Sequence, residues 1–107
     1  MASHSIYALC DPDTGDVRYI GRTSQSLSKR LSNHLTNSNP HWSHRQPALA
    51  EWIIDLRERG ARPGIVLLTT ILDRKVAKKA EWQWIALFAD NGCNLLNVFG
   101  IPKQAQP

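Results

Sequence analysis

The chain of 107 residues has few cysteines, few acidic residues and no long apolar run. Its two cysteines, Cys10 and Cys93, have no Cys-x-x-Cys partner, which argues against a disulfide framework or a zinc knuckle and favours free thiols in a reducing cytoplasm. No apolar run approaches a membrane span, and the N-terminus lacks a signal-peptide pattern. The length predicts one domain over residues 1–100, with a polar tail over residues 101–107.

Acidic residues are scarce, with nine Asp and Glu against thirteen Lys and Arg, and the net charge is +4. This charge suits a polyanionic partner such as nucleic acid, although many equally basic proteins bind none. All but one of the carboxylates fall in expected turns, caps, helix ends or solvent-facing positions. Glu81 is therefore the one candidate ligand for a divalent ion. A two-metal site is disfavoured because it needs several converging carboxylates.

Two short apolar runs flank a turn-rich segment near the start of the chain. Residues 5–10 and 17–22 are rich in β-favouring types, whereas residues 11–16 contain Pro, Asp and Gly, so we predict a β-hairpin. Each strand carries one tyrosine, Tyr7 or Tyr19. A register that pairs residues whose numbers sum to an even value would place both phenols on one face of the sheet.

A helix is predicted from Leu27 to Leu35, where three leucines form an apolar stripe at helical spacing. Arg30 and His34 lie together along one edge of this stripe, and Lys29 falls on the far side. One turn apart, Arg30 and His34 could reach a single anion at the protein surface. The alternative is an ordinary arginine at the margin of a core beside a surface histidine.

The segment from Thr36 to Gln46 is polar and interrupted by proline, which predicts a loop. His41 and His44 have the spacing of two zinc ligands, but no nearby residue completes a tetrahedral set. A more plausible role for this loop is contact with a nucleic-acid backbone or base, through His41, Trp42 and Arg45. A solvated loop without a role is the alternative.

Two buried elements follow this loop. Residues 47–60 predict a packing helix, because Pro is favoured in a first turn, Gly60 ends the pattern and apolar residues repeat at i, i+3, i+4 and i+7. Its end and the next turn carry Arg57, Arg59 and Arg62, which could touch phosphate but also suit the C-terminus of a helix electrostatically. Residues 65–72 are nearly continuously apolar and predict a strand buried on both faces at the centre of the sheet.

The last predicted helix begins after Asp73, which can cap it, and ends near Asp90. Glu81 falls inside the apolar stripe of this helix. A carboxylate that faces a core is unfavourable unless it is paired, hydrogen-bonded or bound to a metal. Such a break in the local pattern often marks a functional site; the alternatives are a buried ion pair or a residue at the rim of the core.

Five positions along the chain match, in order, the sequence signature of a known protein family. The triplets Ser5-Ile6-Tyr7 and Tyr19-Ile20-Gly21, followed by Arg30 and Glu81 on later helices and by Asn97 after two leucines, resemble the GIY-YIG nuclease family. Ser5 stands where the family usually has glycine, the family's downstream glycines are only partly present as Gly100, and Asn94 is the alternative to Asn97. The resemblance implies an α/β (α+β) fold with a small, central, mostly antiparallel three-stranded sheet flanked by three helices.

The resemblance also implies a divalent-metal-dependent DNA endonuclease with one Mg²⁺ or Mn²⁺ ion held by Glu81. Tyr7 would activate the attacking water, and Arg30 would stabilise the developing charge. Tyr19 would help to order the water or a phosphate oxygen, His34 could relay the proton, and Asn97 would support the site. Arg22 and Lys29 are further candidates for contact with nucleic acid. Because a tyrosine is a poor base at neutral pH, Arg22, Arg30 and His34 are candidates to lower its pKa. A covalent role for Tyr7 is the alternative.

Other functional interpretations remain open from the sequence. The same fold could be a non-catalytic nucleic-acid-binding module, or a nuclease subunit that needs a partner for targeting. An unrelated α/β protein with coincidental tyrosines is the third alternative. Because no separate DNA-binding domain fits in this length, the enzyme would cut with little sequence preference, recognise a structure or a single strand, form a homodimer, or be delivered by a partner.

Overall fold

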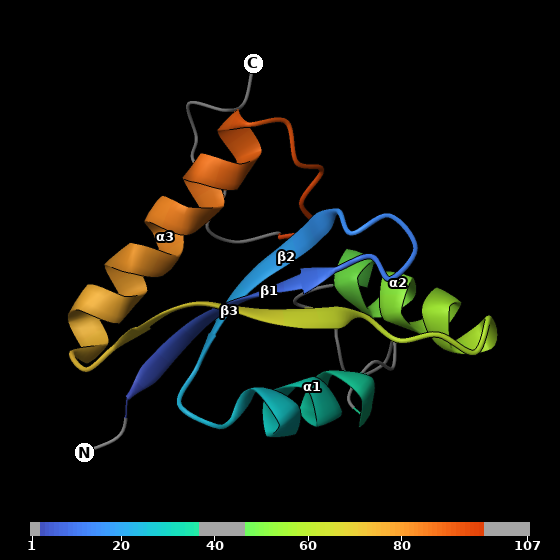
Figure 1. The fold of residues 1–107 in the computed structure, drawn as a ribbon, viewed down its shortest axis with the longest axis horizontal. Coiled ribbons are helices and arrows are strands. Elements are labelled where there is room, and N and C mark those ends of the chain that lie inside the picture. The colour runs from blue at the N-terminus through green and yellow to red at the C-terminus, as the bar shows by residue number, and fades with distance from the viewer. Residues whose placement is uncertain (1–2, 37–46, 98–107) are drawn as a thin grey trace.

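The structure, a computed structural model, describes residues 3–36 and 47–97. Within these ranges the order of elements is β1 (His4–Cys10), β2 (Val17–Thr23), α1 (Leu27–Thr36), α2 (Pro47–Glu58), β3 (Gly64–Ile71) and α3 (Arg74–Asp90). The three strands form one antiparallel sheet, with α3 packed on one face and α1 and α2 on the other (Figure 1). This α+β arrangement confirms the predicted fold class.

The predicted hairpin is present as β1 and β2. Its turn is held by Asp11, whose carboxylate accepts hydrogen bonds from the backbone N–H of Asp13 at 2.8 Å and of Thr14 at 3.1 Å. Gly15 supplies the positive φ of 79° that the turn requires. In the register, Tyr7 lies opposite Gly21 and Leu9 lies opposite Tyr19, so the two phenols share one face as expected.

The order of the strands corrects one prediction. The sheet runs β2-β1-β3, so β1 is central and β3 is an edge strand. Two apolar residues of β3, Val66 and Leu67, are about half exposed, at 50% and 49%. The prediction of a strand buried on both faces at the centre of the sheet is therefore wrong in both respects. A run of apolar, β-branched residues favours a strand, but its burial and its place in the sheet depend on which distant elements pack around it.

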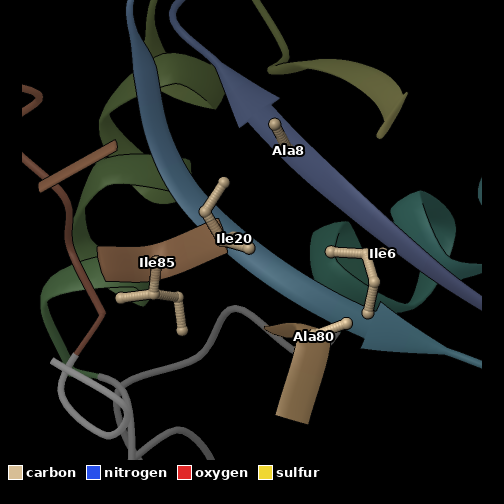
Figure 2. Packing of buried hydrophobic residues seen from close by; sticks show 5 residues of the cluster. All are labelled: Ile6, Ala8, Ile20, Ala80 and Ile85. Carbon is tan, nitrogen blue, oxygen red and sulfur yellow. The ribbon is translucent and has the colours of Figure 1, made fainter. Parts of the chain in front are cut away.

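Two clusters of buried side chains hold the helices to the sheet. Figure 2 shows the first, in which Ile6 and Ala8 of β1 and Ile20 of β2 meet Ala80 and Ile85 of α3. Fully burying an isoleucine side chain contributes about 1.5–3 kcal/mol. The second cluster joins the opposite face of the hairpin to α1 and α2; its buried members are Tyr7, Leu9, Tyr19, Leu49 and Ile53. Both tyrosines thus belong to the α1 and α2 side of the sheet.

Asp73 caps α3 as predicted, because its carboxylate accepts hydrogen bonds from the backbone N–H of Lys75 and of Val76. Ser5 pairs with Thr23 on one side and Thr70 on the other, and positive φ values in the described ranges occur at glycines alone. Serine therefore fits the strand where the family usually has glycine. The proposed nucleic-acid contacts His41, Trp42 and Arg45, and the predicted tail, lie outside the described residues.

Candidate active site

The candidate site is built around the phenol of Tyr7, which is fully buried at 0% exposure at the middle of the central strand. The phenol lies against Gly21 on β2. A Cβ atom at Gly21 would overlap both the hydroxyl oxygen and Cζ of Tyr7, and would also lie 2.9 Å from a ring carbon of Tyr19. Gly21, the last residue of the second triplet, therefore provides the space that the Tyr7 phenol occupies.

Helix α1 brings two polar side chains to the hydroxyl of Tyr7. Nε of Arg30 donates a hydrogen bond to the Tyr7 oxygen at 3.1 Å, and that oxygen lies 2.7 Å from Nε2 of His34. The leucines of α1 pack against the same cluster as Tyr7, which fixes the side of the helix that faces the sheet. The predicted pairing of Arg30 and His34 along one edge is thus realised, with the tyrosine oxygen as their common partner.

The surroundings of Tyr7 keep its hydroxyl protonated. Burial raises the pKa of Tyr7, the guanidinium of Arg30 opposes this shift, and the carboxylate of Glu81 adds to it. Burial, assisted by Arg30, lowers the pKa of His34 to about 4, so its imidazole is neutral near pH 7. A neutral imidazole can accept the phenolic proton at Nε2. Of the three residues expected to lower the pKa of Tyr7, Arg30 does so but does not outweigh burial.

Tyr19 completes an aromatic group around His34. Its ring centroid lies 6.4 Å from that of Tyr7 and 5.7 Å from that of His34. Burial, followed by the neighbouring Tyr7, raises the pKa of Tyr19, so this phenol is also uncharged. The apolar ring surfaces around His34 contribute to the desolvation that keeps the imidazole neutral.

Glu81 of α3 forms an ion pair with Arg22 of β2, with 3.6 Å between Oε1 and Nε. Both side chains are about a quarter exposed, and Nε of Arg22 has no hydrogen-bond partner within the described part of the chain. Burial raises the pKa of Glu81, and Arg22 opposes that shift. Glu81 also acts electrostatically on Tyr7, Tyr19 and Arg30, although it comes from α3, which packs on the opposite face of the sheet from the two tyrosines. The ion-pair alternative for Glu81 is therefore realised beside the site.

Asn97 holds the outer edge of β2. Its side-chain oxygen accepts a hydrogen bond from the backbone N–H of Ile20 at 3.1 Å, and its Nδ2 donates to the Ile20 carbonyl at 2.8 Å. The next contact along this edge is a 2.6 Å hydrogen bond from the Leu96 N–H to the carbonyl of Arg18. The amide of Asn97 thus takes the place of a neighbouring strand beside Tyr19 and Gly21.

Among the described residues, Glu81 is the candidate ligand for a metal ion. Within residues 3–36 and 47–97, no group of three or more His, Cys, Asp or Glu side chains could hold an ion. One carboxylate suits a magnesium ion that keeps several waters and takes a phosphate oxygen from its substrate. The residues therefore fit a one-metal site with a single protein ligand and do not fit a two-metal clamp.

Three features of this arrangement were not predicted from the sequence. They are the steric role of Gly21, the pairing of Arg22 with Glu81, and a basic pocket that reaches Arg74. The alternation of β2 offered one signal, since it sends Arg22 to the face on which α3 packs. No sequence pattern links Arg74 to the strands. Lys29, a predicted nucleic-acid contact, is exposed on α1.

Histidine 34 should give the protein a measurable loss of stability in acid. Its folded pKa of about 4 lies below the ordinary 6.5, so between these values the unfolded chain binds more protons than the folded chain. We expect the free energy of unfolding to fall between pH 6.5 and 4 by up to about 1.4 kcal/mol per pH unit from this group. Urea titrations of wild type and His34→Gln measure the difference in slope.

The matched control is His4→Gln, which removes a histidine of β1 outside the contacts of Tyr7. This variant should keep the wild-type slope, whereas His34→Gln should flatten it. Equal slopes for wild type and His34→Gln would contradict the assignment of a neutral, buried His34.

A family model described as the GIY-YIG catalytic domain matches residues 3–94, which is most of the chain. This match includes every residue in contact with the Tyr7 hydroxyl, together with Glu81, and ends before Asn97. No curated protein and no solved structure matches significantly. None of the helices in the described ranges is long and apolar enough to cross a membrane.

Proposed function

We propose, since the chain belongs to the GIY-YIG family of nucleases, that it is a divalent-metal-dependent endonuclease that hydrolyses phosphodiester bonds of DNA. The observation that carries this proposal is the Tyr7 hydroxyl, which Arg30 and His34 share at 3.1 Å and 2.7 Å. A hydroxyl held between a cation and a neutral imidazole is suited to moving a proton beside an anionic substrate.

In the proposed reaction, Tyr7 and His34 act as a proton relay. Because the pKa of Tyr7 is raised and that of His34 is lowered, the resting site keeps the proton on Tyr7. The phenol passes this proton to Nε2 of His34 as its oxygen takes a proton from the attacking water. The phenol is therefore never left as a free phenolate, and the water gains hydroxide character as it approaches phosphorus.

The remaining residues stabilise charge and hold the geometry. Arg30 lies at the Tyr7 oxygen and would bind the scissile phosphate as negative charge develops. Glu81 would hold one Mg²⁺ or Mn²⁺ ion, which when bound supplies charge neutralisation at the phosphate and its leaving oxygen. Tyr19 orders the water or a phosphate oxygen, and Asn97 keeps β2 in place beneath it.

The direct test is cleavage of single-stranded, double-stranded and branched DNA by the purified chain, with Mg²⁺, Mn²⁺ or EDTA. We expect cleavage of at least one substrate with either metal and none in EDTA, and the preferred substrate then defines the specificity. Binding of DNA without cleavage of any substrate would contradict the proposal and would support a binding module of the same fold. A protein–DNA adduct in a denaturing gel would instead indicate a covalent role for Tyr7.

Arg22 should compete with the metal for Glu81. The two side chains already pair at 3.6 Å, so a metal ion at this carboxylate must displace the guanidinium or share the carboxylate with it. We expect Arg22→Gln to bind Mn²⁺ about threefold to tenfold more tightly than wild type without DNA, since a nearby like charge opposes a second cation. Calorimetric titration with Mn²⁺ at pH 8 measures the affinity.

The control for this experiment is Arg59→Gln. Arg59 pairs with Asp13 and Asp55, so its removal deletes an equal charge from an ion pair that does not include Glu81. Its Mn²⁺ affinity should equal that of wild type. Unchanged or weaker Mn²⁺ binding by Arg22→Gln would show that the ion does not share the carboxylate of Glu81.

A further inference from the structure

A basic pocket of about 580 Å³ adjoins the Tyr7 site. The side chains around it come from the start of β1, the end of β2, the turn before α1, α1 itself and the first residue of α3, which lie at one end of the sheet (Figure 1). They are His4, Arg22, Thr23, Ser24, Gln25, Arg30, Asn33 and Arg74. Of these described residues three are arginines and none is acidic, so the pocket is suited to an anion.

The three arginines differ in what they already contact. Arg30 donates to the Tyr7 oxygen and Arg22 pairs with Glu81, so both connect the pocket to the proposed cleavage centre. Arg74 is exposed, and no salt bridge joins it to a carboxylate anywhere in the described ranges. Its neighbour Asp73 is committed to capping α3. Arg74 therefore lines the pocket with a charge that no carboxylate of the described residues pairs.

The wall between these arginines is held by hydrogen bonds. Nδ2 of Asn33 donates to Oε1 of Gln25 at 2.8 Å, and the backbone N–H of Gln25 donates to Oγ1 of Thr23 at 3.0 Å. These contacts tie the turn between β2 and α1 to the helix. A ligand would meet a wall that is already ordered, which reduces the entropy lost on binding.

We propose that this pocket binds a second backbone phosphate of the DNA strand, next to the scissile phosphate, with Arg74 as its counter-ion. The inference rests on the proposed nuclease function. A strand whose scissile phosphate lies at Arg30 has to continue past the site, and it carries one negative charge per nucleotide. The pocket lies beside Arg30 and adds Arg22 and Arg74 to its lining, so it offers the strand further positive charge next to the scissile phosphate. Arg74 thereby fixes the register of the strand against Tyr7 without touching the reacting atoms.

The first test compares Arg74→Gln with wild type in binding to a 20-nucleotide DNA of the form that wild type cuts, in EDTA. We expect about fivefold to tenfold weaker binding and a salt slope reduced by about one unit, because one phosphate contact is lost. In cleavage assays with Mg²⁺, Arg74→Gln should raise KM for the DNA by a larger factor than it lowers kcat. The control is Lys79→Gln, which removes a positive charge about 140° around α3 from Arg74 and should bind as wild type does.

The second test locates the phosphate. Single neutral methylphosphonates are placed on either side of the scissile position, and each is bound by wild type and by Arg74→Gln. At the contacted position the two losses should not add, because either change removes the same interaction. Additive losses at every position, or wild-type affinity and slope in Arg74→Gln, would overturn this inference while leaving the nuclease function intact if wild type still cuts. Wild type that neither binds nor cuts DNA would overturn both.

Discussion

Replacing Glu81 with glutamine should reduce metal-dependent cleavage of DNA by at least about a thousandfold. In the described ranges no cluster of acidic or imidazole side chains could take over as a metal site. A metal ion at a reacting phosphate supplies several kcal/mol of charge stabilisation, and each 1.4 kcal/mol corresponds to a tenfold change in rate. Glutamine keeps the size of the side chain but offers a neutral oxygen, so the loss reports on charge.

The rate should be measured under single-turnover conditions, with Mn²⁺ affinity determined alongside. Folding should change little, by about 1 kcal/mol at most, because the ion pair with Arg22 is partly exposed. Glu51→Gln is the matched control, since it neutralises one exposed carboxylate on α2 and should cut as wild type does. Activity within tenfold of wild type in Glu81→Gln, with unchanged Mn²⁺ binding, would place the metal ligand elsewhere.

The second large effect is expected at Gly21, where alanine should disable the site through sterics alone. The added Cβ would overlap the hydroxyl and Cζ of Tyr7, whose ring is fully buried and cannot move aside into solvent. We expect the free energy of unfolding to fall by about 1–3 kcal/mol, as for other overpacked cores. Cleavage should fall by about a hundredfold or more, because the phenol shifts from Arg30 and His34.

Gly64→Ala provides a matched control within the same sheet. A Cβ at Gly64 would lie 3.9 Å from Cβ of Cys10, which is ordinary van der Waals contact. This variant should retain both its stability and its rate of cleavage, as measured by urea unfolding and single-turnover assays. If Gly21→Ala also behaved as wild type, the phenol of Tyr7 would not occupy the position over β2 on which the proposed relay depends.

Much of this fold could be read from local sequence. The turn residues between Asp11 and Asp16, the alternation of the two hairpin strands and the helical spacing of the leucines gave the hairpin and α1 within a residue or two. The cap at Asp73 and the shared face of the two tyrosines followed from equally local rules. These features depend on neighbours in the chain, so a sequence window contains the information that sets them.

The contacts among the candidate site residues could not be predicted from the sequence. The family resemblance picked out Tyr7, Arg30 and Glu81 in order, but the direction of the pKa shift on Tyr7 depends on how deeply the fold buries its ring. The sequence suggested Arg22, Arg30 and His34 as groups that could lower the pKa of Tyr7. In the structure, burial of Tyr7 by two helices and a second tyrosine raises its pKa by more than the guanidinium of Arg30 lowers it.

The sequence by itself determined which residues face which side of each element, and thereby which side chains could meet around Tyr7. Tertiary structure alone decided the lateral order of the strands, with β3 at an edge and Asn97 covering the other edge. It also decided that Arg22 meets Glu81 and that Arg74 reaches the pocket beside Arg30. The physical reason is that side-chain periodicity is a local property, whereas strand order and contacts between distant elements depend on long-range packing that no single segment encodes.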